Sequence, residues 1–141
     1  MDVKKVIAEL QRLFPGKTMV ENKNSLGVTT EVVCEKDPTE NHADYSESIA
    51  VVDASTIHYH KKLTEKYEIM KGDLEVFKYD ANKLLYKEYK LKKGEMITIH
   101  PGEIHSCKGD ETWVKVVSKP GWTPGDYINL ETIIKKYLKK A

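Results

Sequence analysis

The first stretch of the chain, residues 2–14, repeats its apolar positions with the period of an α-helix. Asp2 is suited to cap the first turn, and Pro15-Gly16 is a strong stop signal. The apolar positions follow the i, i+3, i+4, i+7 spacing of one buried face: Val3, Val6, Ile7, Leu10, Leu13 and Phe14. The pattern predicts an amphipathic N-terminal helix within residues 1–16.

Between residues 26 and 118 the period of the pattern changes to two. Runs of β-branched and aromatic residues alternate with polar ones, and turn-forming residues separate the runs, as at Lys108-Gly109-Asp110. Roughly eight short strands at about ten-residue spacing predict an antiparallel sandwich or barrel over residues 26–118. The expected strands are residues 27–35, 48–53, 56–60, 65–70, 74–80, 84–91, 95–99 and 112–118.

The pattern becomes helical again near the end of the chain. Residues 119–128 are rich in Pro and Gly, contain Trp122, and are expected to form a loop. Asn129 is suited to cap the helix that follows. Its apolar stripe consists of Leu130, Ile133, Ile134, Tyr137 and Leu138. We expect a C-terminal helix over residues 129–140 and a single domain over residues 1–141.

The composition narrows the range of partners. The 141 residues include 23 basic and 22 acidic ones, which leaves a net charge of +1. The basic residues are interspersed with acidic ones, so we expect no nucleic-acid partner. Two cysteines, Cys34 and Cys107, are too few for a disulfide framework, which favours a reducing compartment. No apolar run approaches the roughly 20 residues that span a bilayer. We expect a cytoplasmic protein without a membrane partner.

Two of the five histidines, His58 and His60, lie one residue apart on an expected strand. Residues two apart on a strand point to the same face, so their imidazoles project together from Cα atoms about 7 Å apart. Glu65 follows His60 at an odd offset, which would place it on the opposite face of one continuous strand. Glu65 can join the two histidines only if residues 61–64 form a turn and Glu65 begins the next strand.

A third histidine, His105, follows the Pro101-Gly102 turn and starts another expected strand. Three imidazoles and one carboxylate form a mixed nitrogen and oxygen donor set. Such a set suits one divalent transition metal, Fe, Mn, Ni, Co or Zn, and disfavours Cu(I) and iron–sulfur clusters. Buried polar groups need partners, and a cation would supply one inside a barrel. We therefore predict a metal site, with the identity of the ion left open.

The spacing HxHx4Ex6G over residues 58–72 resembles the first motif of the cupin superfamily, and Gx7GxxH over residues 94–105 resembles the second. The resemblance implies an antiparallel double-stranded β-helix, the cupin or jelly-roll barrel, here with an N-terminal and a C-terminal helix. It also implies that four residues bind the metal: His58, His60, Glu65 and His105. The sequence departs from the family pattern at Val52, His100 and Gly109, none of which removes a ligand.

A metal centre in a small barrel leaves several functions open. The first is a metal-dependent enzyme, of isomerase or dioxygenase type, that acts on a small sugar, keto-acid or diol. Tyr67 and His100 are the candidates for a catalytic role in such an enzyme. The alternative is a non-catalytic module that binds or senses a small molecule. The amphipathic terminal helices and Trp122 favour a homodimer.

Overall fold

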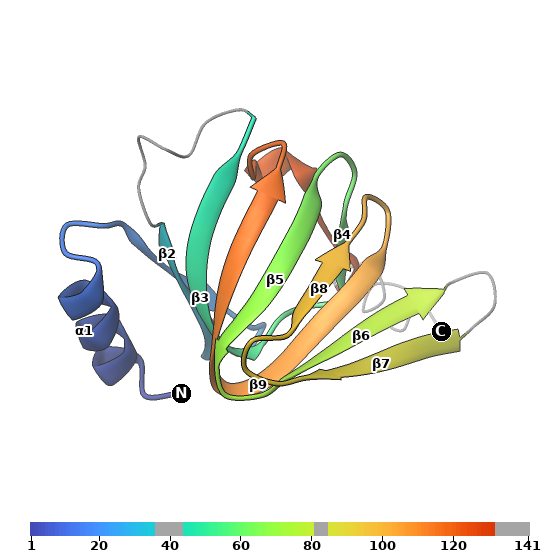
Figure 1. Cartoon of the computed structure of the whole chain (residues 1–141). Helices are drawn as coiled ribbons and strands as arrows, with labels where there is room; N and C mark the ends of the chain where they lie inside the picture. The colour runs from blue at the N-terminus through green and yellow to red at the C-terminus, as the bar shows by residue number, and fades with distance from the viewer. Residues whose placement is uncertain (36–43, 81–84, 132–141) are drawn as a thin grey trace.

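The computed structural model of the protein describes residues 1–35, 44–80 and 85–131 (Figure 1). In chain order the elements are α1 (Val3–Leu13), β1 (Met19–Lys23), β2 (Thr29–Glu35), β3 (Ser46–Ala54), β4 (His58–His60), β5 (Thr64–Lys71), β6 (Leu74–Asp80), β7 (Leu85–Leu91), β8 (Met96–Ile99), β9 (Ile104–Lys119), a 3-10 turn (Pro124–Asp126) and β10 (Tyr127–Asn129).

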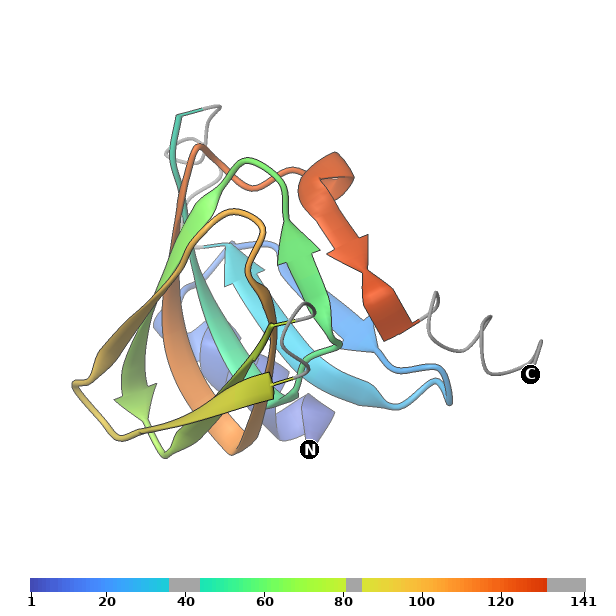
Figure 2. The same cartoon turned by 90° about the vertical axis from the view of Figure 1, so that its right-hand side faces the viewer.

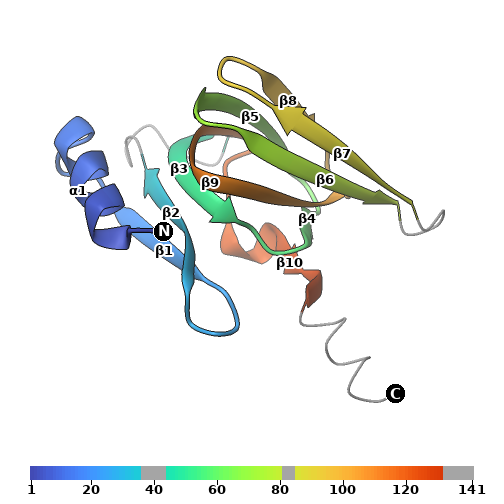
Figure 3. The ribbon, with the colours of Figure 1, turned by 90° about the horizontal axis from the view of Figure 1, so that it is seen from below.

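The strands form one antiparallel sheet that curls on itself. Its main path is β1-β2-β3-β9-β4-β10, while β5 pairs with β8 and β9, and β6 pairs with β7 and β9. Seen from below, the sheet bends from β2 through β3 and β9 to β4, so that β2 and β4 lie across the interior from each other (Figure 3). This curvature lets side chains from distant strands converge.

The interior of the curled sheet holds the larger apolar core. Alternate residues of each strand point inward, as strand geometry requires. The buried members are Ala50, Val52, Tyr67, Ile69, Leu74, Val76, Leu91, Ile99, Cys107 and Val114. This set follows the alternation that predicted the strands, and it lines the space into which the site residues project.

The helix α1 covers the outer face of β2 and β3, as Figure 1 shows. The expected cap is confirmed, because the Asp2 side chain accepts a hydrogen bond from the Lys5 N–H at 3.3 Å. Val6 and Leu10 are buried against the sheet in a second apolar cluster. The sheet residues of that cluster are Val32, Cys34, Ile49, Val51 and Trp113. The sheet is therefore buried on both faces at β2 and β3.

The turn residues Lys108-Gly109-Asp110 do not end a strand as expected, because β9 runs through this point over 16 residues. Up to Gly109, β9 pairs with β6, and from Trp113 onward it pairs with β5. The change of partner occurs at a bulge, where the register with β3 shifts and Glu111 has a φ of 46°. The turn-forming residues therefore coincide with a sharp bend inside β9, where the strand folds back without ending (Figure 1).

The C-terminal part of the chain also differs from the prediction. The loop expected at residues 119–128 contains the start of β10, which pairs antiparallel with β4 (Figure 2). The Asn129 side chain accepts a hydrogen bond from the Glu131 N–H at 2.9 Å, which agrees with its expected role as a cap. Leu130 and Glu131 are helical, and the rest of the helix expected at residues 129–140 lies outside the described residues.

Candidate metal centre

Four polar side chains meet inside the curled sheet. His58 and His60 come from β4, Glu65 from β5 and His105 from β9. All four are buried, with exposed fractions of 5%, 2%, 6% and 0% in that order. Each offers one ligand atom, and these atoms lie within 4.8 Å of one another. The structure therefore brings together the four residues that the sequence assigned to a metal site.

Local geometry explains why these residues converge. His58 pairs in register with His105 across β4 and β9. His60 projects from the same face of β4 as His58, because the two are separated by one residue. The chain then turns after His60, and Glu65 lies at the start of β5. The turn inferred from the odd offset between His60 and Glu65 is present.

Each imidazole is oriented by a backbone carbonyl on its outer side. The Nδ1 atom of His58 lies 2.6 Å from the Thr56 oxygen, and that of His60 lies 3.1 Å from the Asp126 oxygen. The Nδ1 atom of His105 lies 2.9 Å from the Glu103 oxygen. A carbonyl accepts only, so a neutral imidazole donates its Nδ1–H there and keeps a lone pair on Nε2. This tautomer is the one that binds metal ions through Nε2.

The inner nitrogens face the Glu65 carboxylate. The Nε2 atoms of His60 and His105 lie 2.8 Å and 3.8 Å from Glu65 Oε1. Among the described residues, however, the buried His60 Nε2 has no hydrogen-bond partner of acceptable geometry. A buried polar atom without a partner is costly, and a cation between the imidazoles and the carboxylate would remove that cost. The donor set thus fits a divalent transition metal.

The protonation states of His58, His105 and Glu65 also favour a metal site. Burial, followed by the charge of His105, lowers the pKa of His58 to about 3, and burial also lowers the pKa of His105. Burial raises the pKa of Glu65, but the three imidazoles outweigh this effect and the net pKa is lowered. Near neutral pH, His58 and His105 are therefore neutral and Glu65 is ionised, which are the forms that bind metal.

The pKa of His60 shifts the other way from those of the other two histidines. Burial lowers it, but the Glu65 carboxylate 2.8 Å from Nε2, together with the Asp126 carbonyl, raises it above its usual value. In the protein without metal, a proton on His60 would balance the Glu65 carboxylate. A divalent ion would have to displace this proton, so metal binding at this site would be coupled to proton release.

The two catalytic candidates from the sequence occupy different positions. The Tyr67 hydroxyl lies 3.2 Å from Glu65 Oε1 and 3.3 Å from His105 Nε2, so it contacts two of the four ligand residues. Burial, followed by the charge of Glu65, raises its pKa well above the usual value, which keeps the phenol protonated. His100 is exposed directly after β8, and its backbone N–H donates to Glu103 Oε1 at 2.6 Å. Of these two catalytic candidates, only Tyr67 contacts the four-residue cluster.

Asp126 supports the site, although no metal-ligand spacing in the sequence pointed to it. Its carboxylate accepts the backbone N–H groups of Lys61, Lys62 and Leu63 at 2.9 Å, 3.0 Å and 3.0 Å, respectively. Its carbonyl oxygen faces His60 Nδ1. One buried residue thus holds the turn between β4 and β5 and also orients a ligand. Its position after Pro-Gly in an expected loop was the only available signal.

We expect Asp126→Ala to weaken metal binding by about tenfold, because residues that orient ligands typically contribute that much. It also removes the acceptor of three backbone N–H groups and should lower the free energy of unfolding by about 2 kcal/mol. Metal titration and urea unfolding measure the two effects. Asp110→Ala, at an exposed position, is the matched control. Equal metal affinity in both variants would contradict the orienting role.

Tyr127 closes another side of the cluster. Its ring stacks on His58, with centroids 4.4 Å apart and planes at 21°. Its hydroxyl is hydrogen-bonded to Thr56 Oγ1, next to the carbonyl that orients His58. Because Tyr127 belongs to β10, which the sequence did not predict, its position at the site was missed.

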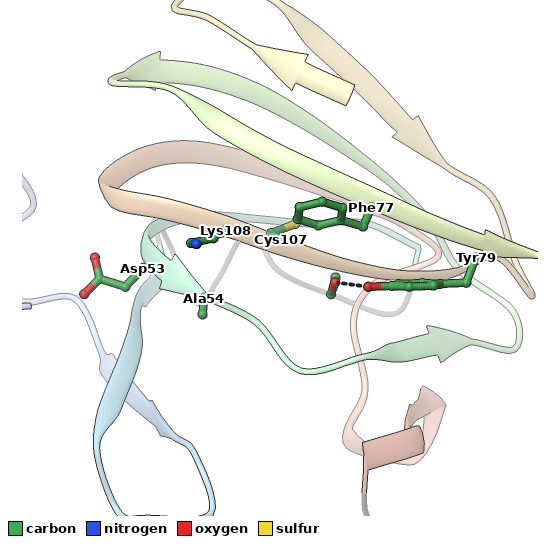
Figure 4. Close-up of a pocket in the computed structure, with 7 residues that line it drawn as sticks. Asp53, Ala54, Phe77, Tyr79, Cys107 and Lys108 are labelled. Atoms are coloured by element: carbon green, nitrogen blue, oxygen red, sulfur yellow. Dashed lines mark hydrogen bonds between the residues drawn. The ribbon is translucent and has the colours of Figure 1, made fainter. Parts of the chain in front are cut away.

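A surface cavity of about 420 Å³ is lined by residues of β3, β6 and β9 (Figure 4). Tyr79 contributes to its wall and is hydrogen-bonded to Ser106 Oγ at 3.2 Å. Ser106 lies between His105 and Cys107 on β9, so its side chain points away from the barrel interior. The lining residues are Asp53, Ala54, Phe77, Tyr79, Ser106, Cys107 and Lys108, and none is a member of the cluster.

Comparison with known proteins identifies the fold. No family model and no curated protein matches the sequence. Among solved structures, Streptomyces Pac13, described as a unique nucleoside dehydratase, is 9% identical with a TM-score of 0.66, and the match covers 82% of this chain and 86% of Pac13. An oxalate decarboxylase of Bacillus subtilis is 15% identical with a TM-score of 0.62, over 83% of this chain and 31% of that one.

A third similar structure is CapF, a capsular polysaccharide assembling protein of Staphylococcus aureus. It is 16% identical with a TM-score of 0.63, and the match covers 84% of this chain and 33% of CapF. The chain therefore spans about a third of the length of the decarboxylase and of CapF. These likenesses and the curled antiparallel sheet confirm the predicted cupin fold. Among the described residues, no helix is long and apolar enough to cross a membrane.

Proposed function

We propose that the protein is a metal-dependent cupin enzyme that acts on a small polar molecule. One divalent transition metal, Fe, Mn, Ni, Co or Zn, would be held by His58, His60, Glu65 and His105. The observation that carries the proposal is the orientation of the three imidazoles. Each Nδ1 faces a carbonyl, so each neutral ring leaves its Nε2 lone pair free for the buried cluster.

The residues around the cluster support chemistry at the ion. A bound divalent metal would supply Lewis acidity toward substrate oxygen atoms. Four protein ligands leave room for such atoms on an ion that accepts six. Tyr67, kept protonated by burial, offers a hydroxyl next to Glu65 and His105. The apolar interior limits the access of water and strengthens electrostatic interactions at the site.

The substrate is proposed as a sugar, keto-acid or diol, because two adjacent oxygen atoms can bind one ion together. Isomerase and dioxygenase chemistry both remain open at such a centre. Pac13 and oxalate decarboxylase carry the names of enzymes that act on small molecules, which is consistent with this class. The homodimer, the cytoplasmic location and the single domain over residues 1–141 stay predictions.

The proposal is tested by measuring the metal content of the purified protein and then its stability after the metal is removed. We expect protein from cells supplied with all five metals to retain about one divalent ion per chain, measured by elemental analysis. Dialysis against a chelator should lower the stability by roughly 2.7 kcal/mol relative to protein with metal at about 100 times its Kd. For a chain of this size the melting temperature should fall by roughly 10 °C.

Restoring the ion should restore the melting temperature. Protein that retains none of the five metals, and whose melting temperature does not change when they are added, would contradict the metal centre. If the metal-loaded protein binds a sugar, keto-acid or diol tightly and returns it unchanged, it is a binding module instead of an enzyme.

A further inference from the structure

A second carboxylate, that of Glu31, belongs to the wall of the barrel interior. Glu31 pairs in register with Val52 across β2 and β3, and Val33 pairs with Ala50. Paired residues share a face of the sheet, and Ala50 and Val52 belong to the interior core. Glu31 therefore points to the interior, from the strand that lies across the barrel from β4 (Figure 3).

The charge of Glu31 acts on the groups that surround the proposed metal ligands. Tyr67 contacts Glu65 and His105, and Tyr127 stacks on His58. Burial is the main cause of the raised pKa values of both tyrosines, and the charge of Glu31 raises both further. The charge of Glu65 acts on Glu31 in turn. Val52, the register partner of Glu31, belongs to the same core cluster as Tyr67, so Glu31 faces the interior that holds the four-residue cluster without being one of its members.

The Glu31 carboxylate is available for proton exchange. Among the described residues, its hydrogen-bond donor is Asn22, whose Nδ2 lies 2.6 Å from Oε1, and no lysine or arginine forms an ion pair with it. The side chain is half-buried, so part of its surface is open to solvent. Burial raises its pKa to about 7, with Asn22 opposing this shift and Glu65 adding to it. A group of this kind can accept and return a proton near neutral pH.

We propose that Glu31 is the acid–base residue of this site and that the substrate is a small molecule with two adjacent oxygen atoms, one of them a hydroxyl. When the two oxygens bind at the ion, the hydroxyl proton passes to a Glu31 oxygen. The electron pair of the broken O–H bond stays on the substrate oxygen, which becomes anionic. The reverse transfer returns the proton. This inference rests on the proposed metal function.

Glu35 provides a matched control on the same strand. It lies four residues after Glu31 on the same face of β2, opposite Ser48. Glu31→Gln and Glu35→Gln each remove one negative charge from this face. Only the first removes the carboxylate whose charge acts on Tyr67 and Tyr127. Gln also keeps an oxygen that can accept the Asn22 hydrogen bond.

The experiment uses acetohydroxamate, which binds metals through two adjacent oxygens and loses a proton when it does so. Wild-type protein and both variants are loaded with Co²⁺ and titrated at about pH 8, with the visible Co²⁺ spectrum as the measure of binding. Calorimetry in buffers of different ionisation enthalpy counts the protons released. We expect wild type and Glu35→Gln to release little acid, whereas Glu31→Gln releases about one proton per site and binds about tenfold more weakly.

The possible results distinguish a failure of the role assigned to Glu31 from a failure of the proposed metal function. If Glu31→Gln matches wild type in affinity and proton release, the assignment of Glu31 is overturned while the metal function stands. If both variants change alike, the effect is one of general charge and the assignment is likewise overturned. If wild type fails to bind Co²⁺, or if acetohydroxamate leaves the Co²⁺ spectrum unchanged, the proposed function fails and the inference fails with it.

Discussion

Replacing His105 by alanine is expected to lower the affinity for divalent metal by at least a factor of about 100. Changes to residues that only orient ligands cost up to about that factor, and loss of a ligand should cost more. His105 is 0% exposed, and its Nε2 faces Glu65 while its Nδ1 faces the Glu103 carbonyl. Competition titration with a chromogenic chelator measures the change.

The matched control is His100→Ala, which removes an exposed imidazole after β8. Its metal affinity should equal that of wild type. The variant His105→Gln, which fills more of the space of the lost ring, separates metal loss from a packing defect. If His105→Gln is folded by circular dichroism and binds metal like wild type, His105 is not a ligand.

The second large effect is expected for Gly109→Ala at the bulge of β9. A Cβ at this position would lie 2.6 Å from Thr112 Oγ1 and 2.7 Å from the Val52 carbonyl oxygen. Thr112 is fully buried, and its hydroxyl donates to the Asp73 carbonyl at 2.5 Å, so it cannot move without losing that bond. We expect the free energy of unfolding to fall by about 3 kcal/mol, because buried sites tolerate added atoms poorly.

Urea unfolding measures this loss, with Gly125→Ala as the control. A Cβ at Gly125 would have no neighbour within 4 Å, and this glycine does not adopt a positive φ. Its substitution should change the stability little. Equal stability of the two variants would show that β9 can shift at Gly109 at no cost, contrary to the close approach of Val52 and Thr112.

The helix α1 and the strands β2 to β8 could be predicted because their patterns are local, whereas β1 and β10 were missed. Helical spacing of apolar residues and the period of two in the strands need no knowledge of distant contacts. Turn residues were less informative. Lys108-Gly109-Asp110 is typical of a turn that separates two strands, but β9 bends here at its bulge and pairs with other strands on both sides of this point. The pairing partners of β9 are distant in sequence, so its continuity could not be predicted.

The alternation of polar and apolar residues in β2 shows a second limit of prediction from the sequence. Val32 and Cys34 are the apolar half of this strand, and they face α1. Glu31 and Val33 lie on the other face, which lines the barrel interior. Both faces are covered, so polarity alone does not tell which side of the strand holds the site. The position of α1 on the outer face decides it.

By itself, the sequence predicted the four proposed ligands: strand parity brings His58 and His60 together, and the resemblance to the two cupin motifs implies the full set with Glu65 and His105. His58, His60 and Glu65 are near neighbours in the chain, and the turn between them follows from their odd offset. Only the tertiary structure decided what surrounds them. Asp126 lies 65 residues from the N–H of Lys61 that it accepts, and Glu31 reaches the interior from β2. Such contacts depend on how the sheet curls, and that curvature arises from strand pairing between distant segments.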